Sequence, residues 1–224
     1  MVSVLARPSP NFGARRDGLT PSLIVLHYTA MASAAAALDR LCDPLTEVSA
    51  HYLIAGDGTI WQMVDEVQRA WHAGAGEWRG QDDINSRSIG IELDNRGTHP
   101  FANAQMVALE GLMPQIMARW GITPAGVIGH SDMAPGRKCD PGPRFDWPRL
   151  ARQGLARAAA QGLVNVADSR RFRRTAQQAG FTAGASDADL LQAVRLRFRP
   201  WGKGPLSAED MAVLPGAVHR VLST

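Results

Sequence analysis

Residues 126–142 read Gly-Val-Ile-Gly-His-Ser-Asp-Met-Ala-Pro-Gly-Arg-Lys-Cys-Asp-Pro-Gly. The tetrad 126–129 predicts a short buried strand. Because proline and glycine are frequent after it, the residues from His130 onward are expected to form a loop and not a helix. This loop contains His130, Lys138 and Asp140, and its prolines would hold these side chains at set angles. An ordinary surface loop with an incidental histidine is the simpler alternative, and the rest of the chain decides between the two.

Length and composition indicate a globular protein. At 224 residues, with 45% of them hydrophobic, the chain can form one or two domains with a sizeable core. It has no run of about 18 apolar residues, so no transmembrane segment is expected. The first 18 residues lack the apolar stretch of a secretory signal, which favours a cytoplasmic location. The alternative is the periplasm or outer membrane, if a signal was removed. Cys42 and Cys139 do not indicate a disulfide framework.

The distribution of charge indicates two parts. Residues 1–151 contain 13 Lys and Arg against 16 Asp and Glu, whereas residues 152–224 contain 11 against 5. This contrast favours a boundary near residues 152–168. The basic second part has no motif that interleaves aromatic and basic residues, so no nucleic-acid partner is expected.

Strand-like and helix-like patterns alternate along the first part. Short apolar runs, typical of strands, occupy residues 23–26, 51–54, 59–64, 88–93 and 127–128. A turn signal at 56–58 predicts that the second and third runs form a hairpin. Helical patterns occupy residues 33–41, 103–120, where Pro114 should produce a kink, and about 146 to 162. This alternation predicts an α/β fold with a mixed central β-sheet flanked by helices.

Three polar side chains follow or end predicted strands. His27 and His130 each lie just beyond a short buried strand, and Glu92 lies near the end of another. Ligands bind at the carboxyl ends of strands in open α/β sheets. Together with Asp140, the two histidines would supply three metal ligands and leave a fourth position for water, which is typical of a catalytic zinc site. The same ligand types also fit an iron site, but the usual iron spacing of histidine and carboxylate is absent, which favours zinc.

Such a site has the parts of a hydrolase. Zinc would lower the pKa of its bound water toward ~7 and polarise a carbonyl group. Glu92 would then be free to act as general base and general acid. Lys138 could neutralise the oxyanion of a tetrahedral intermediate.

Six motifs resemble, in order, those of the zinc N-acetylmuramoyl-L-alanine amidases of the amidase type 2 family, which is related to peptidoglycan recognition proteins. The motifs lie at residues 27–29, 49–52, 70–74, 89–93, 129–132 and 136–143. The resemblance covers roughly residues 20–150 and is strongest to the AmpD/AmiD branch. It implies cleavage of the amide bond between N-acetylmuramic acid, or its 1,6-anhydro form, and L-alanine of peptidoglycan stem peptides. Peptidoglycan or a muropeptide is therefore the expected partner.

The resemblance also implies the roles of individual residues. His27, His130 and Asp140 match the Zn²⁺ ligands, Glu92 matches the catalytic glutamate, and Lys138 matches the lysine that assists the transition state. Cys139 departs from the family pattern, in which a small or polar residue such as threonine is common. Its side chain is expected to point away from the metal, because Asp140 and not Cys139 is the expected ligand.

The remaining candidate residues have more ordinary interpretations. Trp71 and His72 are candidates for substrate binding, since an aromatic face can stack on a sugar or peptide, although packed loop residues are an equal alternative. His51 is expected to be a structural hydrogen-bonding residue, and Asp132 a carboxylate that caps the loop. His99 and His219 lie outside every motif and are expected at the surface.

The C-terminal part predicts three short helices at residues 168–179, 186–198 and 207–222. The last two begin with the Ser-x-x-Asp pattern of a capping box. Residues 191–201 resemble the central helix of a peptidoglycan-binding-like domain. The expected organisation is a catalytic domain at 1–155, a linker at 156–167 and a small three-helix peptidoglycan-binding-like domain at 168–224.

Two classes of function therefore compete. The first is a zinc amidase, and the second is a recognition module of the same fold that binds muropeptide without cleaving it. Non-catalytic members of the superfamily usually lack a metal ligand. Since all three ligands and Glu92 are present, the sequence favours the enzyme.

Overall fold

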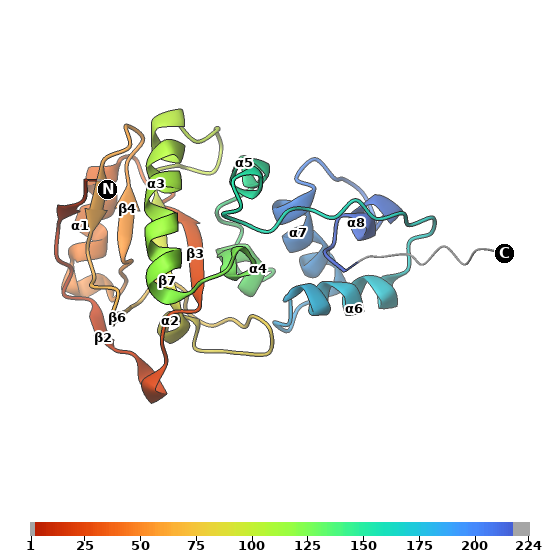
Figure 1. Cartoon of the computed structure of the whole chain (residues 1–224), viewed down its shortest axis with the longest axis horizontal. Coiled ribbons are helices and arrows are strands. Elements are labelled where there is room, and N and C mark those ends of the chain that lie inside the picture. The colour runs from red at the N-terminus through yellow and green to blue at the C-terminus, as the bar shows by residue number, and fades with distance from the viewer. Residues whose placement is uncertain (1–2, 217–224) are drawn as a thin grey trace.

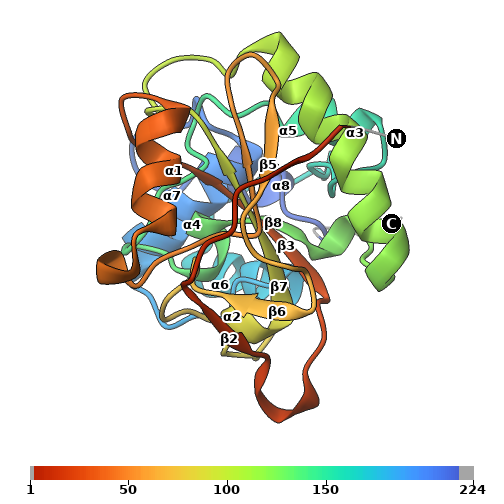
Figure 2. The same cartoon turned by 90° about the vertical axis from the view of Figure 1, so that its left-hand side faces the viewer.

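The structure, a computed structural model, describes residues 3–216 and is built on a mixed six-stranded sheet (Figures 1 and 2). The strand order is β1-β5-β4-β7-β3-β8, with β4 and β5 antiparallel and the other neighbours parallel. These strands are β1 (Leu5–Ala6), β3 (Leu23–Tyr28), β4 (Tyr52–Ile54), β5 (Ile60–Gln62), β7 (Ser88–Leu93) and β8 (Val127–Gly129). A second, two-stranded antiparallel sheet pairs β2 (Phe12–Ala14) with β6 (Gln68–Ala70). The predicted mixed sheet and the hairpin are confirmed.

Each face of the sheet is covered by helices. One face, with Ile24 and Leu26 of β3, packs against α3 (Asn103–Trp120), which ends at Gly121 as predicted. The other face, with Val25, packs against the C-terminal helices, while Leu53 on that side of β4 packs against α1 (Ala34–Cys42). Figure 1 shows α3 lying across the sheet, with the C-terminal helices α6, α7 and α8 on the β3 side of it. Side chains alternate between the faces of a strand, so Ser88, Gly90 and Glu92 of β7 share the face of His27.

Two predicted elements of the first 155 residues differ in the structure. Residues expected to be loop from His130 onward begin with one helical turn, α4 (His130–Met133). This turn forms because Asp132 accepts a hydrogen bond from the backbone N–H of Gly129, whereas the prolines restrict only the later residues. The helix expected over 146–162 is also shorter: α5 (Trp147–Arg152) ends before Gly154, whose φ of 70° is left-handed. A further short helix, α2 (Ile84–Arg87), precedes β7.

The C-terminal part forms the helices α6 (Ser169–Ala179), α7 (Asp187–Phe198) and α8 (Ala208–Ala212). The first two match the predicted positions, with Asp168 and Ser186 as their N-caps. The third ends at Ala212 and is shorter than expected, and residues 217–222 of that prediction lie outside the described residues. Residues 157–165 contain no helix or strand.

The C-terminal helices share a hydrophobic core with the sheet. Phe172, Leu190 and Val194 belong to the same buried cluster as Val25 and Ile128. The helices therefore pack directly on β3, which carries His27, and on β8, which ends just before His130. The domain boundaries at 155 and 168 stay a prediction. No helix among residues 3–216 has the length and apolar character needed to cross a membrane.

Candidate active site

Three parallel strands bring the predicted site residues together. His27 of β3 lies directly beside Glu92 of β7 in the register of the two strands. β8 pairs with β3 on its other side and ends at Gly129, so that His130 follows at the same edge of the sheet. The histidines and the glutamate, far apart in sequence, meet where the strands end, as in other open α/β sheets.

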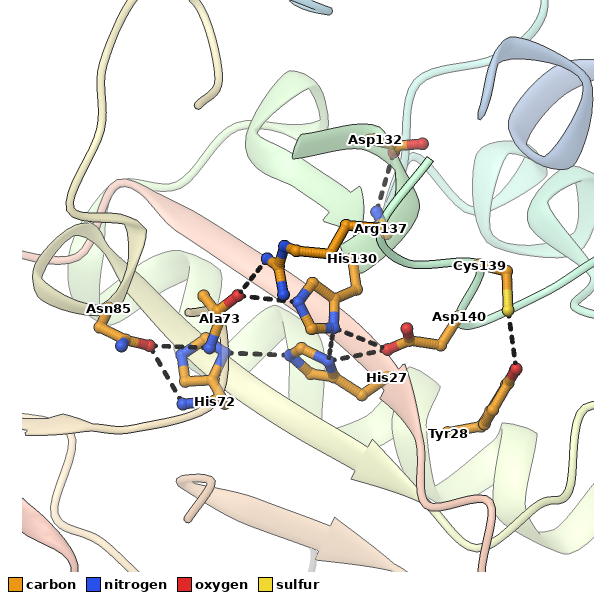
Figure 3. Close-up of polar contacts among 11 residues, drawn as sticks. His27, Tyr28, His72, Ala73, Asn85, His130, Asp132, Arg137, Cys139 and Asp140 are labelled. Carbon is orange, nitrogen blue, oxygen red and sulfur yellow. Dashed lines mark hydrogen bonds and ion pairs between the residues drawn. The ribbon is translucent and has the colours of Figure 1, made fainter. Parts of the chain in front are cut away.

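His27, His130 and Asp140 form a compact cluster of possible metal ligands (Figure 3). Nδ1 of His27 lies 2.9 Å from Nδ1 of His130 and 2.9 Å from Oδ2 of Asp140, and the third side of this triangle is 3.0 Å. A tetrahedral zinc ion with ligands at ~2.0–2.1 Å would hold its ligand atoms roughly 3.3 Å apart. The two imidazoles and one carboxylate therefore fit a zinc ion in type, number and convergence.

The ring of His130 is oriented by the backbone. Its Nε2 lies 2.9 Å from the carbonyl oxygen of Ala73, which can only accept a hydrogen bond. Nε2 therefore carries the hydrogen of the neutral ring and Nδ1 presents its lone pair to the cluster. Arg137 also donates to this carbonyl, at 2.7 Å. Oδ1 of Asn85 accepts the backbone N–H groups of His72 and Ala73, and so fixes the loop from the other side.

The electrostatic surroundings favour the forms that bind a cation. Burial, and secondarily the neighbouring His130, lower the pKa of His27 to about 4, so its ring is neutral near pH 7. Burial alone would raise the pKa of Asp140, but its close contacts with the rings of His130 and His27 outweigh this effect and hold that pKa well below its usual range. Neutral imidazoles and an ionised carboxylate are the protonation states that a metal ion requires.

Glu92 lies in the same cavity but is not one of the three converging ligands. Burial, and then the charge of Asp140, raise the pKa of Glu92 to about 8, while Lys138 has the opposite effect. Among residues 3–216, Oε2 of Glu92 is buried and has no hydrogen-bond partner. An unpartnered carboxyl group beside a metal cluster is available for proton transfer.

The site opens into a cavity of about 410 Å³. Lys138 is exposed and lies on its wall, so its ammonium group is accessible from the cavity. Trp71 and His72 also line the cavity, as do Tyr28, Arg40 and Arg137. All seven predicted site residues are therefore gathered around one opening, although both ring nitrogens of His72 are already engaged by protein groups.

The structure also places the residues that were interpreted as non-catalytic. His51 is buried, accepts from the N–H of Gly90 and contacts the carbonyl of Gln68, which confirms a structural role. Asp132 caps α4, and His99 is exposed, both as predicted. The Sγ atom of Cys139 lies 3.0 Å from the hydroxyl of Tyr28, outside the ligand cluster, and both cysteines are free. His219 lies outside the described residues.

Several residues that orient the site were not identified from the sequence. Arg137 lies inside a motif, but its neighbour Lys138 was the evident functional candidate. Asn85 has no sequence signal, because its role depends on a loop that approaches it only in the folded chain. The carbonyl of Ala73 could not have been identified either, since every residue has such a group.

Comparisons with known proteins agree with this site. The family model described as N-acetylmuramoyl-L-alanine amidase matches residues 17–143. The chain is 44% identical over 149 residues to N-acetylmuramoyl-L-alanine amidase AmiD of Escherichia coli (strain K12), a match that covers 59% of this chain and 53% of AmiD. It thus spans about half the length of that relative.

Two further matches cover more of the compared protein. The chain is 36% identical over 167 residues to 1,6-anhydro-N-acetylmuramyl-L-alanine amidase AmpD of Salmonella typhimurium (strain SL1344), a match that covers 67% of this chain and 89% of AmpD. Its fold matches a structure of E. coli AmiD in complex with the substrate anhydro-N-acetylmuramic acid-L-Ala-D-gamma-Glu-L-Lys. That match has a TM-score of 0.77, 32% identity and 88% coverage of both chains.

Proposed function

Because this chain belongs to the N-acetylmuramoyl-L-alanine amidase family, we propose that it is a zinc-dependent hydrolase of peptidoglycan fragments. The bond it cleaves is the amide between N-acetylmuramic acid, or its 1,6-anhydro form, and L-alanine of the stem peptide. The observation that carries this proposal is the convergence of His27, His130 and Asp140 in one cavity with Glu92.

The residues of the cavity have distinct roles in this proposal. His27, His130 and Asp140 would hold the ion, which when bound supplies Lewis acidity at the scissile carbonyl and lowers the pKa of adjacent water. Glu92 would accept the proton of the attacking water and deliver it to the nitrogen of the departing L-alanine. Lys138 would place positive charge beside the oxyanion that develops on the carbonyl oxygen.

The protonation state of Glu92 is central to this mechanism. A general base must be ionised when it accepts a proton, whereas burial raises the pKa of Glu92 to about 8. The positive charge of Lys138 favours the ionised form, and a dication held by the neighbouring cluster would favour it further. Once Glu92 has accepted the proton, its burial makes it a competent acid toward the leaving amine.

Anhydro-muropeptides are the proposed substrates, and this choice is supported by the names of two relatives. One is an amidase for 1,6-anhydro-N-acetylmuramyl-L-alanine, and the structure of another contains an anhydro-muropeptide. A cavity of about 410 Å³ lined by Trp71 and Tyr28 can accommodate part of a sugar or peptide against aromatic faces. Intact peptidoglycan is the competing substrate.

A recognition module that binds muropeptide without cleaving it is the second candidate. Such a module has no need for an ionisable carboxyl group beside the metal cluster. The presence of Glu92, with an unpartnered buried oxygen in the same cavity, favours the hydrolase.

Mass spectrometry of muropeptide digests tests the proposal directly. Purified protein is incubated with anhydro and non-anhydro muropeptides, with chelator, and with zinc restored after chelation. Release of free stem peptide that stops with chelator and returns with zinc is the expected result, and the ratio between substrates identifies the preferred one. Binding without cleavage of either substrate would favour the recognition module instead.

The cellular location and the role of the C-terminal part are also proposals. We expect a cytoplasmic enzyme of muropeptide recycling, which the two free thiols of Cys42 and Cys139 support. Fractionation of cells that contain the native protein tests this location, and recovery with the envelope would contradict it. A pull-down with insoluble peptidoglycan, comparing the chain with a variant altered at exposed Trp201, tests wall binding by the C-terminal part.

A further inference from the structure

The ring of His72 lies between the metal cluster and the β7 strand. Its Nδ1 is 3.0 Å from Nε2 of His27, and its Nε2 is 3.1 Å from the hydroxyl oxygen of Ser88. The ring packs so closely on Gly90 that a Cβ at that position would lie 2.5 Å from Cγ of His72. His72 is therefore wedged against the strand, and its polar atoms point to His27 and Ser88 (Figure 3 shows the first contact).

The hydrogen bonds from His27 through His72 and Ser88 end at a backbone carbonyl, and this carbonyl fixes the direction of each of them. The hydroxyl of Ser88 lies 2.6 Å from the carbonyl oxygen of Ile84, which can only accept, so the single hydroxyl hydrogen is donated there. The oxygen of Ser88 must then accept a hydrogen from Nε2 of His72. A neutral imidazole has one N–H, which leaves Nδ1 of His72 as an acceptor.

The same reasoning extends to the metal ligand. Since Nδ1 of His72 accepts, Nε2 of His27 must donate to it, and the hydrogen of the neutral His27 ring is on Nε2. The lone pair of its Nδ1 is then directed at His130 and Asp140. The reverse direction would leave the Ile84 carbonyl without the Ser88 hydrogen. It would also place an N–H of His27 where the cation binds.

We propose that His72 and Ser88 are positioning residues, which select the Nε2–H form of His27 and so present its Nδ1 to the metal ion. This inference rests on the metal site of the proposed function and assigns His72 a task other than substrate contact. Residues that orient metal ligands in this way typically account for about 10–100-fold in metal affinity.

His130 is oriented in a similar way, through an independent contact of its Nε2 with a backbone carbonyl. There the acceptor is the Ala73 carbonyl itself, one residue from His72 in the same loop. Both metal histidines are thus oriented by adjacent residues of one loop: His130 by the backbone carbonyl of Ala73, and His27 by the imidazole of His72. The hydroxyl that holds His72 comes from β7. The carbonyl needs no further partner to define its direction, whereas the imidazole of His72 needs Ser88.

The first test is made on the unaltered, zinc-free full-length protein. Long-range ¹H–¹⁵N NMR spectra of the histidine rings distinguish a hydrogen on Nδ1 from one on Nε2. We expect the Nε2–H form for both His27 and His72. A hydrogen on Nδ1 of either ring would overturn the proposal without any variant.

The second test measures zinc affinity by competition with a chromogenic chelator. Ser88→Ala should weaken zinc binding about 10–100-fold and populate the Nδ1–H form of His27. Ser86→Ala is the matched control, because Ser86 is equally buried but accepts from the backbone of Arg16, outside this chain of hydrogen bonds. Unchanged affinity in Ser88→Ala, or an equal loss in Ser86→Ala, would contradict the proposal.

A pair of His72 variants separates orientation from packing. His72→Asn can place its side-chain oxygen near the position of Nδ1 and still accept from His27, whereas His72→Leu fills space without an acceptor. Zinc affinity should fall less in the asparagine variant than in the leucine variant, and equal losses would contradict the proposal. Since zinc affinity is measured without substrate, a failure to cleave muropeptides would reject the proposed function and leave this inference standing.

Discussion

Nη1 of Arg197 in α7 lies 3.8 Å from Oδ2 of Asp132 in α4, and the two side chains are only 3% and 2% exposed. The same guanidinium donates to the carbonyl of Val127 in β8 and stacks 3.4 Å above the ring of Trp147. Asp132 in turn accepts from Gly129, the residue before His130. A C-terminal helix is therefore connected to the strand and helical turn that position a metal ligand.

Replacement of Arg197 by methionine should destabilise the protein. Burial raises the pKa of Asp132 to about 6, and the charge of Arg197 opposes this shift. Without that charge, ionised Asp132 would be buried and uncompensated, which typically costs ~3 kcal/mol or more. Urea denaturation should therefore show a larger loss at pH 8 than at pH 5, where Asp132 is protonated. Arg170→Met, at an exposed position of α6, is the control, and a loss of the same size there would refute the argument.

Glu92→Gln should retain zinc and lose activity. Glutamine preserves the size of the side chain but cannot accept and return a proton, which is expected to lower kcat by about 10²–10⁴-fold. The measurements are zinc content by atomic absorption and the rate of stem-peptide release. Glu209→Gln, exposed in α8, should be unaffected. A nearly normal rate in Glu92→Gln would exclude the assigned mechanism.

Asp140→Ala should lose both zinc and activity. Asp140 supplies the only carboxylate of the three-ligand cluster found among residues 3–216, and the remaining two imidazoles would hold zinc weakly. Zinc content after dialysis and the rate of cleavage are measured on the same preparation. Asp82→Ala removes an exposed carboxylate as a control. Stoichiometric zinc in the Asp140 variant would disprove its role as a ligand.

Lys138→Ala should lower kcat more than zinc content. The side chain lies on the cavity wall and is not one of the converging ligands, so its loss removes charge near the reacting carbonyl and leaves the metal in place. We expect a decrease of about 10²-fold or more in kcat. The only other lysine, Lys203, is exposed and provides the matched control. Loss of zinc with a normal rate per bound zinc would instead make Lys138 a structural residue.

The pH dependence of stability offers a test of the environment of Glu92. Its pKa is about 8 in the folded protein, above the ordinary value of 4.5 for a glutamate side chain, so the folded state binds more protons than the unfolded state between these two pH values. Stability should therefore fall as pH rises from about 4.5 to about 8. One pKa unit corresponds to about 1.4 kcal/mol. In zinc-free protein, Glu92→Gln should remove this unfavourable contribution, so the variant should be more stable than the unaltered chain by roughly 5 kcal/mol at pH 9 and by little near pH 4. A pH-independent difference in the free energy of unfolding between the two proteins would contradict the raised pKa.

Much of the fold was predictable because its signals are local. The apolar runs that became β3 and β8, the hairpin signal at 56–58 and the glycine that ends α3 each act over a few residues. Two local predictions were wrong because short-range features decided the structure instead. The cap formed by Asp132 makes residues 130–133 one helical turn, and α5 ends shortly before Gly154, whose backbone is left-handed.

The ligand candidates could also be identified from the sequence, because two histidines and a glutamate occur at or just beyond strand ends and an aspartate follows in the next loop. What the sequence alone determined is therefore the order of strands and helices along the chain and the identity of the chemically active side chains. The direction of the hydrogen bonds that orient His27 was decided only by tertiary structure, as was the contact between Arg197 and Asp132. These features depend on backbone carbonyls, which every residue has, and on packing between distant segments. Neither leaves a pattern in a stretch of sequence, because the partners become neighbours only when the chain folds.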